Sequence, residues 1–398
     1  MDMSLRAREF ADEKIKTVRE RLGNERDVDD FMAMRLIIQT IFDDERSMFF
    51  SYEDIECAIN RIFYKTRRKL GILQPLIDDE NVSEIMVNGP SDIFVERGGK
   101  IEKYSEQFDS TEELEEVMRN IAGEVRREIN ERSPIVDARL PDGSRVNGVY
   151  KNIAINGPIL TIRKFSDSYM HMGDLVGNGT ITADGAHLLT DLVKSGYNIF
   201  VSGGTSSGKT TLLNALAEAV PSDERVIIIE DSAELKMQYI ENIVHLECKN
   251  SNAEGQGGVS MSDLIKSSLR MRPNRIIVGE VRGGEVIDML QAMNTGHDGS
   301  LSTGHANSVE GMLKRLESLY LAAMPISVDA IREQIAEGID IMVHITREKN
   351  GRRRVTEITE LVGYEKGGFV LNTLMKVCEG TELLDMDTGI LRPKRKAG

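Results

Sequence analysis

A glycine-rich run near the middle of the chain has the residue types that bind phosphate. It matches the pattern G-x-x-x-x-G-K-[ST] in full, with Gly203, Gly204, Thr205, Ser206, Ser207, Gly208, Lys209 and Thr210. Glycine leaves backbone N–H groups free to face inward, and the helix expected after the loop adds positive potential at its N-terminus. We expect Lys209 to reach the β- and γ-phosphates of a nucleotide, Thr210 to bind Mg²⁺ and Thr211 to begin the helix packing. The alternative is a glycine-rich turn without a ligand.

Acidic residues follow two other apolar runs that resemble strands in composition. Glu230 and Glu234 come after residues 226–229, and Glu280 follows residues 275–279. Ligands of an open parallel sheet bind outside the carboxyl ends of its strands, so these acids are expected beside the phosphate-binding loop. There they would hold a metal or orient water, although each acid taken alone could also be a helix N-cap.

Two histidines lie in a later segment that is rich in glycine and hydroxyl groups. His297 and His305 are eight residues apart, which does not suit helical zinc ligands at i and i+4, and no cysteine is close in sequence. An imidazole at a strand end can instead bond a terminal phosphate and report its presence. We favour His305 for this role, whereas His297 could equally be structural.

The order of apolar runs indicates how these residues are positioned. From residue 186 to residue 398, strand-like runs alternate with amphipathic stretches, which is typical of βαβ units around a parallel sheet. Asn350-Gly351 predicts a hairpin between residues 341–345 and 355–358. The preceding chain is predicted to contain a helical region, a small α+β domain and an interdomain linker, at residues 1–74, 75–165 and 166–185.

Composition excludes several classes of protein. The 398 residues include 65 acidic and 50 basic ones, and the net charge of −15 disfavours general binding to nucleic acid. The three cysteines are far apart and form no disulfide framework. The longest apolar runs are too short to span a bilayer, and the first residues are charged, so we expect a cytoplasmic protein.

Four ordered motifs together carry a family resemblance. They are the phosphate-binding loop, the acidic box at 230–235, the run 271–283 that contains Glu280, and the two-histidine segment. In this order they resemble the secretion ATPases of type II and type IV systems. The likeness is greatest to the CpaF or TadA branch that powers tight-adherence (Flp-type) pili. It covers roughly residues 75–365 and includes residues 85–89 and 138–145 of the smaller domain.

The resemblance implies a fold, cofactors and an assembly. The fold would be α/β, with a RecA-like P-loop NTPase motor domain, a smaller α+β (PAS-like) N-terminal domain and an N-terminal helical extension. Members of the family hydrolyse ATP with Mg²⁺ and form hexameric rings. The ring would act on a membrane-embedded platform protein from the inner face of the cytoplasmic membrane, with no direct binding of nucleic acid.

The resemblance also implies roles for single residues. Glu234 would be the base that polarises water, Glu280 the Walker B acid at Mg²⁺ or the attacking water, and His305 a contact of the γ-phosphate. Glu230 is a further candidate for the metal, in part through water, and whether Glu230 or Asp231 touches it stays open. Arginines near the nucleotide would neutralise developing phosphate charge, or else form surface salt bridges; the candidates are Arg139, Arg145, Arg163, Arg270, Arg272 and Arg282.

Departures from the family pattern narrow the choice of branch. The chain has no C-x-x-C pair, which argues against the type II secretion and pilus-extension branches with their four-cysteine zinc module. Residues 330–338 match the signature of retraction motors only loosely. Three other interpretations stay open: a type IV secretion or conjugation ATPase moving DNA or protein effectors, a small-molecule kinase, and a nucleotide-binding assembly scaffold with little turnover.

Overall fold

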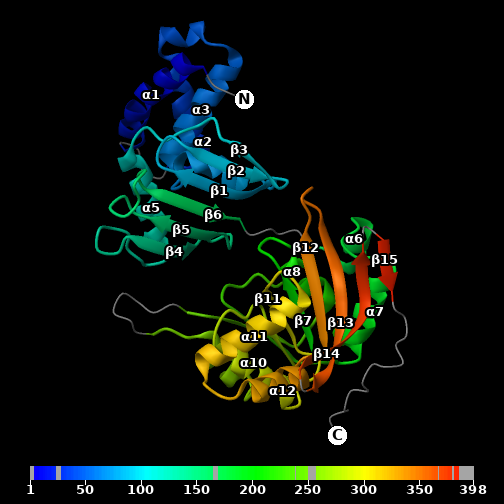
Figure 1. The fold of residues 1–398 in the computed structure, drawn as a ribbon. Helices are drawn as coiled ribbons and strands as arrows, with labels where there is room; N and C mark the ends of the chain where they lie inside the picture. The colour runs from blue at the N-terminus through cyan, green and yellow to red at the C-terminus, as the bar shows by residue number, and fades with distance from the viewer. Residues whose placement is uncertain are drawn as a thin grey trace. The chain divides into compact units, whose positions relative to one another are not determined.

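The chain forms two compact units, residues 1–167 and 168–398, and each is described by itself. The computed structural model describes residues 4–23, 28–164, 169–237, 239–249, 257–365, 367–378 and 381–384. Figure 1 shows the elements of both units along the chain. Within these ranges no helix combines the length and the apolar character needed to cross a membrane.

The first unit begins with a three-helix bundle. Its helices are α1 (Leu5–Gly23), α2 (Asp30–Phe42) and α3 (Tyr52–Arg67), and the 3₁₀ helix η1 (Glu45–Phe49) lies between the last two. Asp29 and Ser51 cap α2 and α3 by accepting bonds from backbone N–H groups of the first turn. Phe10, Ile37 and Ile62 are among the side chains that form the core of the bundle. This bundle is the helical region that the sequence predicts.

A six-stranded antiparallel sheet follows the bundle. The short helices η2 (Gly71–Leu73) and α4 (Gln74–Asp78) lead into it, and its strand order is β3-β2-β1-β6-β5-β4. The core beneath the sheet includes Leu114, Met118 and Ile121 of α5 (Thr111–Glu124). The strands are β1 (Val82–Asn88), β2 (Ile93–Arg97), β3 (Lys100–Lys103), β4 (Ile135–Arg139), β5 (Arg145–Val149) and β6 (Ile159–Arg163).

Buried charges join the bundle to the sheet. Arg61 and Lys65 of α3 each keep only 2% of the side chain exposed. Arg61 pairs with Asp12 of α1 at 2.8 Å and with Asp109, just before α5, at 2.7 Å. Lys65 pairs with Asp109 and with Glu113 of α5. Breaking one partner of such a buried pair is costly, so these contacts hold the helices and the sheet together as one unit.

The second unit contains a nine-stranded sheet with the order β15-β14-β13-β12-β7-β11-β10-β8-β9. The strands from β12 to β9 in this order pair in parallel, and β13, β14 and β15 extend the sheet by antiparallel pairing. The parallel strands are β7 (Ile199–Gly203), β8 (Val226–Glu230), β9 (Ile243–Glu247), β10 (Arg275–Val278), β11 (Leu301–His305) and β12 (Ile341–Arg347). The antiparallel ones are β13 (Arg353–Glu365), β14 (Gly368–Cys378) and β15 (Thr381–Leu384). The predicted parallel sheet and the hairpin at Asn350-Gly351 are both confirmed.

Helices cover both faces of this sheet and create two cores. One core includes α6 (Met172–Gly177), α7 (Ala183–Lys194) and α8 (Lys209–Ala217). The other includes α9 (Met261–Ser268), α10 (Glu285–Asn294), α11 (Val309–Ala323) and α12 (Val328–Gly338). Alternate residues of β7 supply both, since Ile199 and Val201 lie in the first core and Phe200 in the second.

The expected linker at residues 166–185 needs correction. Residues 172–177 form α6, and Leu175 and Ile181 are buried in the core of the second unit. The sequence pattern missed this helix because its six residues are too few to show a helical periodicity. Residues 165–168 lie outside the described ranges.

We predict that Gly299→Ala destabilises the second unit more than Gly351→Ala does. Both glycines have positive φ, +80° and +86°, which costs alanine about 1 kcal/mol. A Cβ at Gly299 would also lie 2.5 Å from Nη1 of Arg275, whereas one at Gly351 meets nothing within 4 Å. Arg275 is fully buried and is held by Glu224 and the Val193 carbonyl, so it cannot move aside freely. Denaturant unfolding should give a loss of about 3 kcal/mol for Gly299→Ala, and equal losses in the two variants would contradict this packing.

Candidate functional site

The phosphate-binding pattern forms a loop between a strand and a helix. β7 ends at Gly203 and α8 begins at Lys209, as the sequence predicts. The loop turns sharply, with φ of +56° at Ser206 and +99° at Gly208. A Cβ at Gly203 would lie 2.3 Å from the carbonyl oxygen of Ile345 on the neighbouring strand β12. Only glycine therefore lets β12 pack this closely against the start of the loop.

The polar groups of the loop suit an anionic ligand. Lys209 is 7% exposed, and its Nζ donates to the carbonyl oxygens of Gly203 at 3.2 Å and Gly204 at 2.9 Å. The hydroxyl of Ser207 is buried and has no hydrogen-bond partner among the described residues. A buried orphan hydroxyl in a loop that precedes a helix N-terminus fits a phosphate. Thr205 is exposed in the loop, and Thr210 and Thr211 occupy the first turn of α8.

A charge chain, in which His305 links the charged groups of Lys209 and Glu280, runs along the carboxyl ends of the strands. Nζ of Lys209 lies 3.3 Å from Nδ1 of His305, and Nε2 of His305 lies 2.7 Å from Oε1 of Glu280. The other oxygen of Glu280 accepts a bond of 2.7 Å from Arg282. Arg282 also lies 3.6 Å from Asp231, directly after β8. The structure thus brings together four residues that the sequence singled out, Lys209, His305, Glu280 and Arg282.

Electrostatics in this chain favour a neutral imidazole. Burial lowers the pKa of His305, and the positive charge of Lys209 lowers it further, whereas Glu280 acts in the opposite direction. The pKa of the Arg282 guanidinium is raised, chiefly by its hydrogen bond with Glu280 and then by the charges of Asp231 and Glu234. Glu234 is therefore close enough to Arg282 to influence it.

Glu230 has a structural task that its sequence position did not reveal. Its side chain is buried, and Oε1 accepts bonds from the N–H groups of Glu234 at 2.9 Å and Leu235 at 3.0 Å. A Cβ at Gly279 would lie 2.9 Å from Cγ of Glu230, so glycine makes room for this carboxylate. Glu230 thereby fixes the turn that carries Glu234. That it also binds metal stays a prediction.

Three predicted residues lie at the opposite edge of the same sheet. His297 precedes β11 and contacts the carbonyl oxygen of Ala292 at 3.1 Å, while Arg270 and Arg272 precede β10. Residues before a parallel strand and residues after it lie at opposite edges. His297 therefore does not lie at the loop, because β11 separates it from His305, and its contact with Ala292 fits the structural role that the sequence left open. Within one chain Arg270 and Arg272 do not lie at the loop either, and their action across chains stays a prediction.

The three predicted arginines of the first unit form a row. Arg139 of β4 is the register partner of Arg145 of β5, and Arg145 is the partner of Arg163 of β6. Residues in register on antiparallel strands share a face, and like charges placed opposite one another are unfavourable. Arg163 is also in register with Glu84 of β1, and Nε of Arg139 donates to the Gly143 carbonyl. The row therefore concentrates positive charge at one place on the sheet.

Sequence reasoning missed residues that pack on the loop from β12 and β13. Nε of Arg353 donates to the Ser206 carbonyl at 3.2 Å, and its stem lies 3.1 Å from the position of a Cβ at Gly208. Ser202, just before the loop, lies 2.8 Å from Nδ1 of the buried His344. The predicted hairpin could have indicated the position of Arg353, because it returns the chain beside β12, which packs on the loop. No sequence pattern indicated His344.

We predict that the imidazole of His305 titrates below its ordinary pKa of about 6.5 in the ligand-free protein. Lys209→Ala should raise this pKa because it removes a repelling charge, and Glu280→Gln should lower it because it removes an attracting one. NMR titration of histidine ring signals, with His305→Gln for assignment, measures both shifts. Shifts of the opposite sign would show that the charge chain is absent in solution.

Known proteins share this fold and sequence. A family model described as type II/IV secretion system protein matches residues 66–369. A putative conjugal transfer protein of Mycobacterium tuberculosis is 34% identical over 315 residues, covering 77% of this chain and 89% of that protein. The conjugal transfer protein TrbB of Rhizobium radiobacter is 37% identical over 298 residues, covering 74% and 88%.

The architecture of the chain has a solved counterpart. The crystal structure of the pilus retraction motor PilT with bound ADP has a TM-score of 0.53 and 20% identity, covering 76% of this chain and 81% of that one. At this identity the likeness concerns the fold, an α/β RecA-like motor preceded by a smaller domain. Together with the matched family model, which spans most of the sequence, it identifies the chain as a member of the type II/IV secretion system protein family.

Proposed function

We propose that this chain is an ATPase of a secretion or conjugation system that hydrolyses ATP to ADP and phosphate with Mg²⁺. One observation carries the proposal: Lys209 of the loop and Glu280 after β10 both contact His305, at the edge where a parallel sheet binds its ligands. Membership of the type II/IV secretion system family supports the same activity. A buried orphan hydroxyl at Ser207 fits the phosphates.

Each residue of the site has a proposed role. Lys209 and the loop N–H groups would bind the phosphates, and Thr210 and Glu280 would hold Mg²⁺, which neutralises phosphate charge when bound. Glu234 would orient the attacking water, with its backbone fixed by Glu230. His305 would contact the terminal phosphate through the ring that now bridges Lys209 and Glu280. Arg282 would add positive charge at the same edge.

We predict that Lys209→Ala abolishes release of phosphate from ATP, because the phosphate-binding charge is lost. Glu234→Gln should keep nucleotide binding but lower kcat at least about a hundredfold, since an amide cannot polarise water. Glu333→Gln, an exposed acid on α12, is the matched control and should be unchanged.

Steady-state phosphate assays with fluorescent-nucleotide binding measure these effects. Turnover close to wild type in Glu234→Gln would remove Glu234 from the mechanism. Background-level turnover in the wild type would favour a scaffold, and a phosphorylated acceptor would favour a kinase.

The arginine row of the first unit is a proposed second half of the site. Arg139, Arg145 and Arg163 would neutralise phosphate charge in the same chain or in a neighbour of a ring, and Arg270 and Arg272 could do so only across chains. What supports this role is the register that places the three arginines side by side on one face of the sheet, where positive charge suits an anionic ligand. A nucleotide bound to both units would favour one arrangement of the two. Loss of the γ-phosphate would then let the units leave that arrangement.

We predict that Arg145→Ala lowers kcat at least about tenfold, because it removes the middle charge of the row. The control is Arg132→Ala, an exposed arginine of the same unit outside the row. Thermal unfolding and phosphate release are measured on both variants. An equal kcat in the two variants would exclude the row from the reaction.

The assembly and cargo are proposed from the family. The chain would form a hexameric ring that acts, peripherally at the cytoplasmic membrane, on a platform protein of a tight-adherence or type IV pilus machine. A mass near that of one chain in light scattering with nucleotide would contradict the ring. The second candidate function is a type IV secretion or conjugation ATPase. It is favoured by the names of the two relatives described above, which are both conjugal transfer proteins.

A further inference from the structure

The three-helix bundle leaves an unusual amount of apolar surface uncovered. Sixteen large apolar side chains are exposed among the described residues, and eight of them lie between Leu5 and Tyr52. The most exposed of these eight are Met48, Phe49 and Tyr52, at 76%, 83% and 81%. Isolated exposed apolar residues need no explanation, but a concentration of them on a small bundle marks an interaction surface.

Five of these eight side chains gather at one end of the bundle, whereas Phe31, Met32 and Ile38 lie elsewhere along α2. α1 and α3 begin at this end and α2 finishes there, since the Ser4 N–H donates to Asp54 in the first turn of α3 and η1 packs against α2. We call this surface the apolar end; it consists of Leu5, Phe42, Met48, Phe49 and Tyr52.

The apolar end is not required to close the core of the bundle. Phe10, Ile41 and Ile55 are already buried beneath it, and the rings of Phe10 and Phe50 lie 5.1 Å apart. The five exposed side chains are therefore available to a partner.

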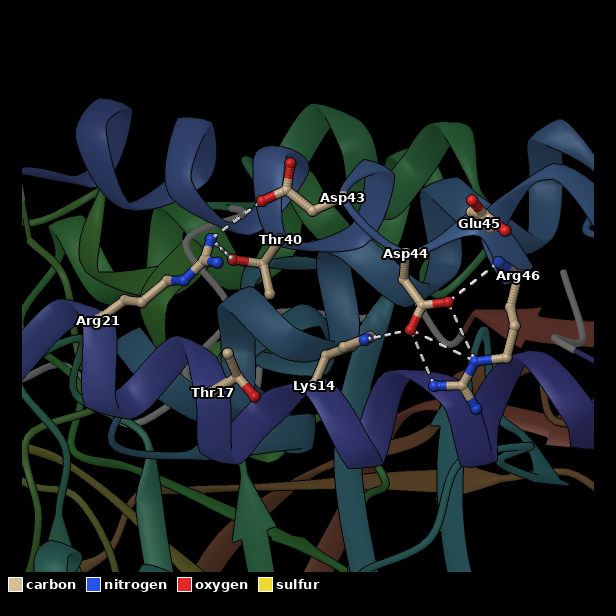
Figure 2. Close-up of a pocket in the computed structure, with 8 residues that line it drawn as sticks. All are labelled: Lys14, Thr17, Arg21, Thr40, Asp43, Asp44, Glu45 and Arg46. Atoms are coloured by element: carbon tan, nitrogen blue, oxygen red, sulfur yellow. Dashed lines mark hydrogen bonds and ion pairs between the residues drawn. The ribbon is translucent and has the colours of Figure 1, made fainter.

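Acidic residues surround the apolar end. Residues 43–54 contain five acids and one base, Arg46. Figure 2 shows that Asp43 is paired with Arg21 and that Asp44 is paired with Lys14 and Arg46, whereas Glu45 takes part in no drawn interaction. The start of α1 also carries charge, and residues 4–14 and 42–54 together contain eight acids and four bases. The acids still exceed the bases when Arg21 is added. The surface therefore attracts cationic partners and repels a bilayer of anionic lipid.

We propose that the apolar end docks a cationic amphipathic helix of a partner protein. Such a helix presents an apolar stripe to Met48, Phe49 and Tyr52, and its flanking lysines or arginines meet the acids at Glu45 and Glu53. Arg61 and Lys65 join the bundle to the sheet, so a helix bound here is held by the whole first unit. The proposal does not depend on hydrolysis of ATP.

Peptide binding to the full chain tests the surface. The probes are a fluorescent amphipathic helix made of leucine and lysine and its counterpart made of leucine and glutamate. We expect the lysine peptide to bind at least about tenfold more tightly, and Met48→Ser/Phe49→Ser to weaken it about tenfold. Ile155→Ser, which removes an even more exposed apolar side chain elsewhere in the unit, should change nothing. Equal binding of the two peptides, or no difference between the variants, would overturn the proposal.

A second experiment separates the partner from the other possible occupants. A photo-crosslinking phenylalanine analogue at position 49 is introduced in the native cell, and the adduct is identified by mass spectrometry. An adduct on a cationic amphipathic segment of another protein supports the proposal. An adduct on a second copy of this chain, no protein adduct, or binding of vesicles of phosphatidylglycerol that Met48→Ser/Phe49→Ser abolishes, would overturn it. We expect these variants to release phosphate from ATP at the rate of the wild type. An absence of phosphate release would contradict the proposed ATPase activity and not the docking surface.

Discussion

The site depends on the insertion of β11 between β7 and β10. Parallel pairing on both sides of β11 sets the end of that strand beside the phosphate-binding loop and beside the segment that carries Glu280. His305 can then contact Lys209 with one ring nitrogen and Glu280 with the other. With any other strand order, these three residues, which are up to 96 positions apart in sequence, would not meet.

The candidate site also requires close packing around the phosphate-binding loop. The loop rests on β12 through Gly203 and beneath Arg353 of β13, and both contacts require glycine at defined positions. Gly279 plays the same part for Glu230, whose buried carboxylate fixes the turn that leads to Glu234. In the acidic box, Glu230 therefore shapes the backbone, whereas Asp231 lies near Arg282. The spacing of the motif alone does not show which acid has which role.

The first unit combines buried ion pairs between its bundle and its sheet with two distinctive surfaces. Its buried pairs around Arg61 and Lys65 join three helices to a sheet, while the arginine row and the apolar end stay on the surface of the same unit. The exposed side chains of the apolar end do not stabilise the unit, because they stay in contact with water. We propose that the apolar end binds a partner and that the arginine row binds phosphate.

Local pattern in the sequence was sufficient for the loop, the alternation of strands and helices, the hairpin at Asn350-Gly351 and the membership of Glu280 and His305 in one site. These features depend on residue type and short-range spacing, which backbone geometry translates directly into structure. Only the tertiary structure decided that His297 lies across the sheet from His305, that α6 belongs to the core, and that Arg139, Arg145 and Arg163 share one register. It also brought Arg353 and His344 to the loop. Strand order and register arise from long-range pairing, and a one-dimensional pattern does not specify which distant strands become neighbours.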